Sequence, residues 1–219
     1  MSKKVAVVLS GCGYLDGAEI RESVLTLLAL DEQGAEVEIF APDQTQHHTI
    51  NHHNGNEENG PRNILAEAGR IARGKVSPLK DASAADYDAL VIPGGFGVAK
   101  NLCDFAFKGS EAKALAEVKN LIQSFYDLKK PIGAICIAPA LVALCLGEKK
   151  VSLTIGNDKE TATEIEKTGA VHIECPVNEA RVDESNKVVS TPAYMFDDAP
   201  LAEINKGIRE CISKTLSLT

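Results

Sequence analysis

Cys136 lies between two apolar segments, PIGAI and IAPALVALC. The first is typical of a buried strand and the second of a helix, so the cysteine occupies the sharp strand-to-helix turn called a nucleophile elbow. Pro139 suits the first turn of that helix, where an N–H has no intrahelical partner. The free amides and the helix dipole favour an anion, so we expect a lowered pKa for the Cys136 thiol. The alternative is a small buried hydrophobic residue without chemistry.

A glycine-rich loop, PGGFG, follows the apolar segment DALVI. Glycines allow a close approach of the backbone, although an ordinary tight turn has the same composition. If this loop lies beside the elbow, the amides of Gly95 and Ile137 form a two-donor oxyanion hole. We expect Gly94 to line the same pocket.

Two glutamates in the segment DGAEIRES are candidates for proton transfer to or from the thiol. Asp16 is the predicted N-cap of a helix, which makes Glu19 its capping-box partner. Glu22 lies one turn further along, in a helix that is apolar nearly all round and is therefore expected to be largely buried. Burial raises the pKa of a carboxyl group toward the neutral range that proton transfer requires. The alternative is a solvated glutamate favoured by the helix dipole.

These motifs carry a resemblance to a known family. The chain order, AICIAP, the GG loop and GAEIRES resemble the ThiJ/PfpI superfamily, which is related to class I glutamine amidotransferases. The set SGCGYLDGAEI, INH, PGGFG, AKNL, CIAP, LTIG and TPAYM is similar to ElbB-type glyoxalase-like proteins, once linked to isoprenoid biosynthesis. The resemblance implies a flavodoxin-like sandwich, Cys136 as nucleophile and Glu22 as its carboxylic partner.

The same resemblance implies an activity. Some members convert glyoxal or methylglyoxal to hydroxy acids without a cofactor or glutathione (a glyoxalase III-type lyase), and protein deglycation has been proposed. Many members also carry a histidine about 20 residues after the cysteine, but here that region reads SLTIGND. We therefore expect no glutaminase. A partner-dependent amidotransferase-like protein and a non-enzymatic redox or carbonyl-stress sensor stay as alternatives.

Strands alternating with helices predict an α/β domain with a mostly parallel sheet and helices on both faces. Ligand sites in such sheets lie beyond the carboxyl ends of the strands, so SGCGYLDG, PGGFG and the elbow should converge. We expect one domain over 1–219, with a polar insertion at about 44–63. The predicted strands span 3–11, 35–42, 86–95 and 131–136, the predicted ribbon 180–192, and the predicted helices 16–34, 110–130, 137–145, 161–170 and 199–216.

Other residue clusters predict less chemistry. Four of the five histidines fall in HHTINHHNG, where the spacing matches no metal-ligand pattern. We expect no metal and no cofactor, with His52 at the rim of the pocket and His172 hydrogen-bonded in a strand. SGCGYLDG departs from GxGxxG at its third glycine, which disfavours a dinucleotide. Cys12 should line the pocket, or pair with Cys136 on oxidation.

Composition limits the remaining possibilities. The net charge of -8 over 219 residues disfavours a nucleic-acid partner, which needs a basic patch. The longest uncharged run, residues 131–147, is too short to span a bilayer, so no membrane association is expected. The opening segment is too short for a signal peptide, and the six cysteines show no disulfide pattern. We expect a cytoplasmic homodimer that acts on a small aldehyde.

Overall fold

The computed structural model describes residues 2–219. Its main feature is a seven-stranded sheet in the order β3-β2-β1-β4-β5-β9-β8, parallel except for β8, which runs antiparallel to β9. The strands are β1 Lys4–Val8, β2 Glu36–Ala41, β3 Ser77–Pro78, β4 Ala89–Ile92, β5 Ile132–Ile135, β8 Arg181–Asp183 and β9 Val188–Thr191. A second sheet pairs β6 Ser152–Leu153 with β7 Val171–His172.

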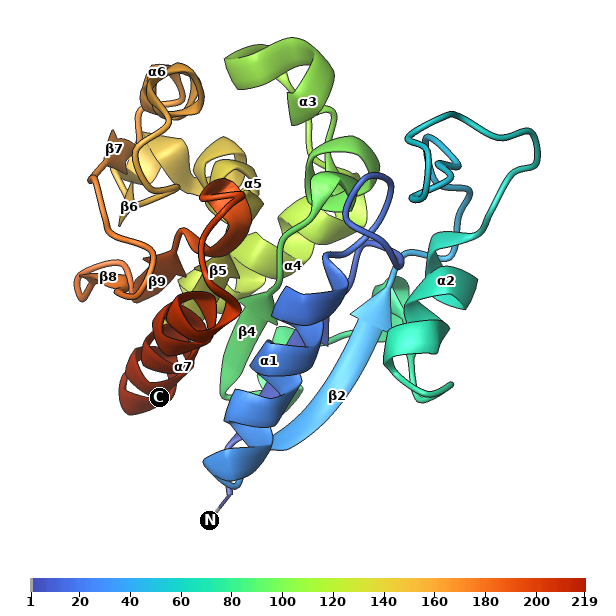
Figure 1. The fold of residues 1–219 in the computed structure, drawn as a ribbon. Helices are drawn as coiled ribbons and strands as arrows, with labels where there is room; N and C mark the ends of the chain where they lie inside the picture. Colours follow the sequence, from blue (N-terminus) through green and yellow to red (C-terminus); the bar gives the residue numbers. More distant parts are fainter. Residues whose placement is uncertain (1) are drawn as a thin grey trace.

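Helices cover both faces of the large sheet (Figure 1). They are α1 Ile20–Glu32, α2 Ile64–Ile71, α3 Phe105–Lys108, α4 Ala116–Asp127, α5 Ala138–Leu146, α6 Lys159–Lys167 and α7 Leu201–Ser217. The packed side chains of α1, α2 and α7 form the core on one face, and those of α4 and α5 form the core on the other. This arrangement is the predicted flavodoxin-like three-layer sandwich.

The central strands are apolar along their whole length because both of their faces are covered. Every residue of β4, β5 and β9 is buried, as parallel strands between two helix layers require. Parallel pairing aligns Ile92 of β4 with Ala134 of β5, and Ile135 of β5 with Thr191 of β9. The carboxyl ends of these strands therefore meet at one edge, where the predicted site lies.

The first helix differs from its prediction at its start. It begins at Ile20, and its N-cap is Glu19, whose carboxylate accepts a hydrogen bond from the Glu22 amide. The predicted N-cap, Asp16, is buried and accepts instead from the Ile50 amide at 2.7 Å and from the Gln46 side chain at 3.2 Å. The capping roles assigned to Asp16 and Glu19 are therefore wrong, because a long-range contact engages Asp16.

The burial predicted for α1 is also only half right. Glu22 lies on its buried face, but Ile20, Val24 and Leu28 are 45–49% exposed. These three residues lie one turn apart on the outer face, away from the sheet. The helix is thus two-faced, and Glu22 is buried because of its position on the helix rather than because the whole helix is enclosed.

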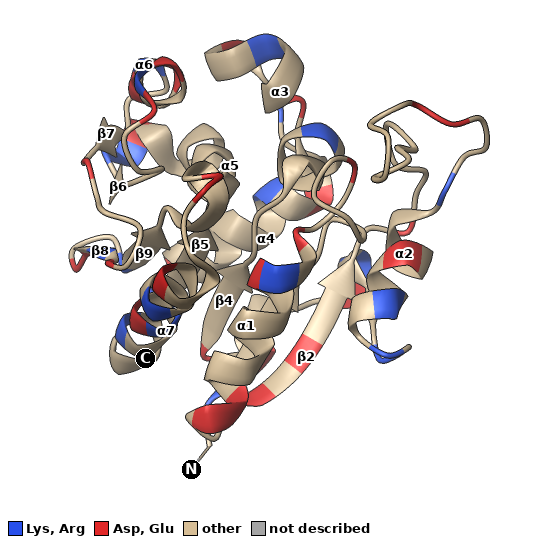
Figure 2. Ribbon diagram, in the orientation of Figure 1, with Lys and Arg blue, Asp and Glu red and all other residues tan. Residues whose placement is uncertain are grey.

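Acidic and basic side chains alternate along α7 (Figure 2), where Lys214 pairs with Glu210 and Lys206 with Glu203.

The polar segment 44–63 is closed by backbone bridges between Thr45 and Asn63 and between residues 50 and 57. Among residues 2–219, no helix is long and apolar enough to cross a membrane.

Candidate functional site

Three loops converge at the carboxyl edge of the sheet, as predicted. Three backbone hydrogen bonds join the loop after β1 to the loop after β4. Glu19 N donates to Gly94 O at 2.9 Å. In the opposite direction, Phe96 N donates to Tyr14 O at 2.7 Å and Gly97 N donates to Gly17 O at 2.9 Å. These backbone contacts fix the loop after β1 and the loop after β4 as one rigid floor beside the turn that follows β5.

Cys136 occupies the turn between β5 and α5. Its φ of 62° lies in the left-handed region that residues with a Cβ rarely adopt, and its N–H donates to Thr191 O at 2.9 Å. Pro139 lies in the first turn of α5, where its missing N–H has no intrahelical partner. The amides of Gly95 and Ile137 lie near the sulfur and lower the pKa of the thiol. This is the geometry expected of a nucleophile elbow.

Glu22 is fully buried next to this thiol. Its Oε2 accepts a hydrogen bond from Gly94 N at 3.0 Å, and its Oε1 accepts one from Tyr194 N at 3.1 Å. The Cys136 thiol lies beside this carboxyl group, and each group shifts the pKa of the other. The two backbone donors hold the carboxyl group in a single orientation.

The electrostatics of the pair differ from expectation. Burial, and secondarily the charge of Glu19, raises the pKa of Glu22 to about 8. Burial, and secondarily the charge of Glu22, raises the pKa of the Cys136 thiol well above its ordinary value, against the opposing effect of the Gly95 and Ile137 amides. The predicted lowering of the thiol pKa is wrong, because removal of the sulfur from water outweighs the helix start. The two groups titrate as a pair whose first proton leaves near pH 8.

An open cavity of about 700 Å³ adjoins the thiol. Its wall combines aromatic rings, the single guanidinium of Arg21 and the carboxylates of Asp158 and Asp197. Arg21 donates to the Tyr194 hydroxyl at 2.9 Å. The lining residues are Tyr14, Glu19, Arg21, Gly95, Phe96, Cys136, Ile137, Asp158, Thr161, Tyr194, Met195 and Asp197. A small electrophile entering this cavity meets the sulfur and both candidate oxyanion donors.

The three residues expected to line the pocket lie outside that lining. Cys12 is half-buried on the side of α2, where its electrostatic neighbours are Glu67 and Arg70. His52 stands behind Tyr14, with ring centres 5.5 Å apart, and its Nε2 accepts a hydrogen bond from Leu15 N. Gly94 lies against Cys136 and Glu22 rather than on the cavity wall. Thus His52 and Gly94 support the site, whereas Cys12 faces away from it.

We predict that Gly94→Ala damages the pair. A Cβ on Gly94 would lie 2.4 Å from the Cys136 Cβ and 2.7 Å from Glu22 Oε2, distances that real atoms do not tolerate. The expected result is loss of about 10²-fold in the reactivity of Cys136 toward iodoacetamide or aldehyde, because small displacements of reacting groups have effects of this size. Gly69→Ala is the matched control, since its nearest neighbour would be a side chain at 3.8 Å. Equal reactivity of both variants would contradict the prediction.

The structure adds residues that sequence reasoning did not assign. Tyr194 contributes a backbone N–H to Glu22 and a side chain to the cavity, and Arg21 contributes the one guanidinium among the described lining residues. Tyr194 belongs to the TPAYM motif, which supported the resemblance without receiving a role. The motif that contains Tyr194 was therefore recognised in the sequence. Its role was not, because every residue except proline has a backbone N–H and the residue type does not show where that N–H donates.

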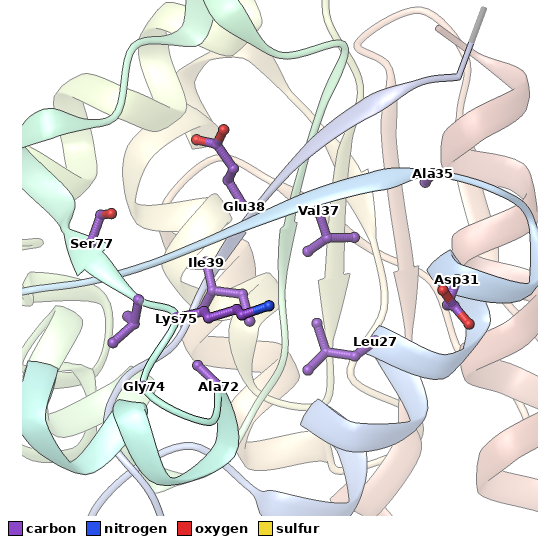
Figure 3. Close-up of a pocket in the computed structure, with 11 residues that line it drawn as sticks. Leu27, Asp31, Ala35, Val37, Glu38, Ile39, Ala72, Gly74, Lys75 and Ser77 are labelled. Carbon is purple, nitrogen blue, oxygen red and sulfur yellow. The ribbon is translucent and has the colours of Figure 1, made fainter.

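A second cavity, of about 750 Å³, lies between α1, β2 and the segment after α2 (Figure 3). Leu27, Val37 and Ile39 give it an apolar floor, with Asp31 and Lys75 beside them. It adjoins the later turns of α1, whereas Glu22 lies in the first turn. The described lining contains neither cysteine nor histidine. We therefore assign the candidate chemistry to the cavity beside Cys136.

The histidine predictions have separate outcomes. His172 lies in β7, and its Nε2 accepts a hydrogen bond from Ile155 N at 3.2 Å, which confirms its predicted role. No histidine is among the described residues that line the cavity beside Cys136. Glu22 therefore stays the candidate acid-base group, because it is buried directly beside Cys136.

Comparisons with known proteins agree with this geometry. The pattern of the DJ-1/PfpI family matches residues 3–172. The rat protein "ES1 protein homolog, mitochondrial" is 46% identical over 99% of this chain and 84% of its own length. The human "Glutamine amidotransferase-like class 1 domain-containing protein 3, mitochondrial" is also 46% identical, over 99% of this chain and 83% of its own. An Ehrlichia chaffeensis crystal structure, described as an isoprenoid biosynthesis protein with amidotransferase-like domain, superposes with a TM-score of 0.92 at 39% identity, covering 99% of both chains.

These relatives correct one expectation. The sequence was predicted to belong to a cytoplasmic protein, but the similar rat, human and zebrafish proteins are all named as mitochondrial. The lack of a disulfide pattern among the cysteines indicates a reducing compartment, but it does not distinguish the cytoplasm from other reducing compartments. The prediction of a cytoplasmic location is therefore contradicted.

Proposed function

The chain belongs to the DJ-1/PfpI family, and from that premise we propose that it is a cofactor-independent, glutathione-independent enzyme converting small 2-oxoaldehydes to hydroxy acids. The observation that carries this proposal is the buried pair of Cys136 and Glu22 beside an open cavity, with the Glu22 carboxyl held by two backbone amides. A nucleophile and a base in contact, with two amides aimed at the reacting sulfur, suit addition to a carbonyl group.

The proposed reaction begins with addition. Glu22 takes the thiol proton as the Cys136 sulfur bonds to the aldehyde carbon of glyoxal, and the carbonyl π electrons move to oxygen. The Gly95 and Ile137 amides donate to that oxyanion, which then receives the proton from Glu22. The product is a neutral hemithioacetal, and Glu22 is again a carboxylate.

The second step is an internal redox reaction that needs no external oxidant. Glu22 removes the proton from the carbon bonded to sulfur, which gives an enediolate, and returns that proton to the neighbouring carbon. The proton of the hemithioacetal hydroxyl passes to the oxygen of the neighbouring carbon. The first carbon is thereby oxidised to a thioester, while the second is reduced to an alcohol. Water then adds to the thioester, the carbon–sulfur bond breaks, and glycolate and the free thiol are released.

The test is steady production of glycolate from glyoxal by the purified protein. We expect many equivalents per chain, at a rate that rises with pH toward the value near 8 at which the pair loses its first proton. One equivalent of a Cys136 adduct without glycolate would contradict the enzyme proposal.

A second candidate is a non-enzymatic carbonyl or redox sensor, in which the Cys136 thiol forms a single adduct or is oxidised once. Burial raises the pKa of Cys136, so little thiolate is present at neutral pH and such a sensor would react slowly. The assay separates the two candidates, because a sensor stops after one equivalent. A partner-dependent amidotransferase-like role is less well supported, since the described cavity lining offers no histidine for amide hydrolysis.

We also predict a homodimer. The prediction rests on the family and on the prevalence of two-fold symmetry among soluble oligomers. Light scattering at micromolar concentration should give twice the chain mass of 23.3 kDa. A mass equal to one chain would contradict it.

A further inference from the structure

The turn that follows β9 contacts both members of the candidate catalytic pair. Thr191, the last residue of β9, accepts a hydrogen bond from the Cys136 N–H at 2.9 Å. Three residues later, the Tyr194 N–H donates to Glu22 Oε1 at 3.1 Å. The two bonds link the thiol and the carboxyl group to one short segment, Thr191–Tyr194, which we name the β9 turn.

The β9 turn has an unusual backbone. Ala193 has a φ of 44°, in the left-handed region, and is fully buried. Among the described non-glycine residues with positive φ, four are lysine or arginine, and the remaining two are Cys136 and Ala193. An interior residue with a Cβ adopts this conformation only where the surrounding contacts impose it. The left-handed conformations of Cys136 and Ala193 therefore both occur next to the Cys136 thiol and the Glu22 carboxyl group.

The conformation of Ala193 decides where the Tyr194 N–H points. That N–H belongs to the peptide between residues 193 and 194, whose orientation follows the backbone angles of Ala193. Pro192, with its restricted φ, precedes it and limits the alternatives. The aim of the donor thus depends on Ala193 and not on the side chain at 194.

The side chain of Tyr194 adds a second link to the same stretch of α1. Its hydroxyl accepts from Arg21 at 2.9 Å, and the Arg21 guanidinium carbon lies 5.9 Å from the centre of its ring. Arg21 is the neighbour of Glu22 in sequence. The β9 turn therefore holds the start of α1 from both the cavity side and the buried side.

We propose that the β9 turn is a positioning element of the active site: Thr191 O fixes the backbone of Cys136, and the left-handed Ala193 directs the Tyr194 N–H onto Glu22. The Gly94 N–H holds the other carboxyl oxygen at 3.0 Å, so the turn supplies the second half of a two-sided clamp. A donor to a carboxylate favours its charged form, so the turn lowers the pKa of Glu22 against the larger effect of burial. The role in catalysis rests on the proposed function, whereas the clamp itself does not.

The clamp can be observed without any substrate. An amide proton that donates to a carboxyl group changes its NMR shift when that group ionises. We expect the ¹⁵N–¹H signals of Tyr194 and Gly94 to titrate together, with one midpoint near 8, and to lose this titration in Glu22→Gln. If the Tyr194 signal stays constant while that of Gly94 titrates, the proposal is overturned.

Variants of Ala193 separate positioning from simple packing. Ala193→Val disfavours the left-handed conformation because Val is β-branched, so the Tyr194 N–H should leave Glu22. We expect the Gly94 signal to titrate about one unit higher and the Tyr194 signal to stop titrating. Ala193→Gly, which adopts positive φ freely, is the control and should keep both midpoints.

The results of these titrations distinguish the positioning role of Ala193, the clamp on Glu22 and the proposed function from one another. Equal midpoints in the wild type, Ala193→Val and Ala193→Gly would overturn the positioning role. If Ala193→Val does not fold, the titration of the wild type and Glu22→Gln alone decides whether the clamp exists. Failure of glyoxal turnover with an intact titration would contradict the proposed function and leave the clamp standing.

Discussion

Cys136→Ser is expected to lower glyoxal turnover by at least about 10³-fold, because a hydroxyl group is a much weaker nucleophile than a thiol and Glu22 alone does not activate it sufficiently. The substitution is nearly isosteric, so the melting temperature should change little. Glycolate formation measured by chromatography, with circular dichroism to monitor folding, provides the test.

Cys12→Ser is the matched control for this experiment. Cys12 is the half-buried cysteine of the loop after β1, and it lies on the side of α2 outside the cavity. Its substitution should leave turnover within twofold of the wild type. Retained turnover in Cys136→Ser would mean that the elbow is only a packing feature and that the proposed enzyme is wrong.

Glu22→Gln should change both catalysis and the pH dependence of stability. Loss of the base is expected to reduce turnover by about 10²–10⁴-fold, the usual contribution of general acid-base catalysis. The stability effect follows from the raised pKa. Between the ordinary carboxyl value of 4.5 and the folded value of about 8, the folded wild type binds a proton that the unfolded chain has released.

The sign of that effect is fixed by linkage. Where the folded state binds more protons, the free energy of unfolding decreases as pH rises, so the contribution of neutral Glu22 is complete below about pH 4.5 and is lost by about pH 8. The shift corresponds to a decrease on the order of 5 kcal/mol over this window. Glu22→Gln has no such proton, so its stability should lack this decline.

Urea unfolding of both proteins at several pH values between 5 and 9 measures the difference directly. The advantage of the wild type over Glu22→Gln should shrink steadily across the window. Parallel stability curves would show that Glu22 ionises in the folded protein as it does in water, and the buried-base mechanism would then lose its basis.

The fold and the centre of the site could be predicted from local sequence. The alternation of apolar strands with helices is a short-range signal, and so is the strand-to-helix turn at Cys136. Glu22 was distinguished from Glu19 by its place one turn further along a helix. All of these inferences depend on residues within about two turns of one another.

What could not be predicted depends on contacts between distant segments. Asp16 is withdrawn from its capping role by the segment 44–63, and the direction of Cys12 is set by a loop in which Gly11 and Gly13 have positive φ. The pKa of Cys136 depends on what closes over it, so the helix start alone gave the wrong direction. The donor at Tyr194 is a backbone group, which any residue type supplies.

The link between Glu22 and Tyr194 joins residues 172 positions apart. Contacts of such long sequence separation form slowly, because a long loop must close before they contribute. During synthesis, at about 5–20 residues per second, β5 and its cysteine leave the ribosome before β9 exists to pair with them. For some seconds of every synthesis the Cys136 thiol therefore lies at an unfinished sheet edge, without the Thr191 carbonyl and the Tyr194 amide that hold the pair in the folded protein.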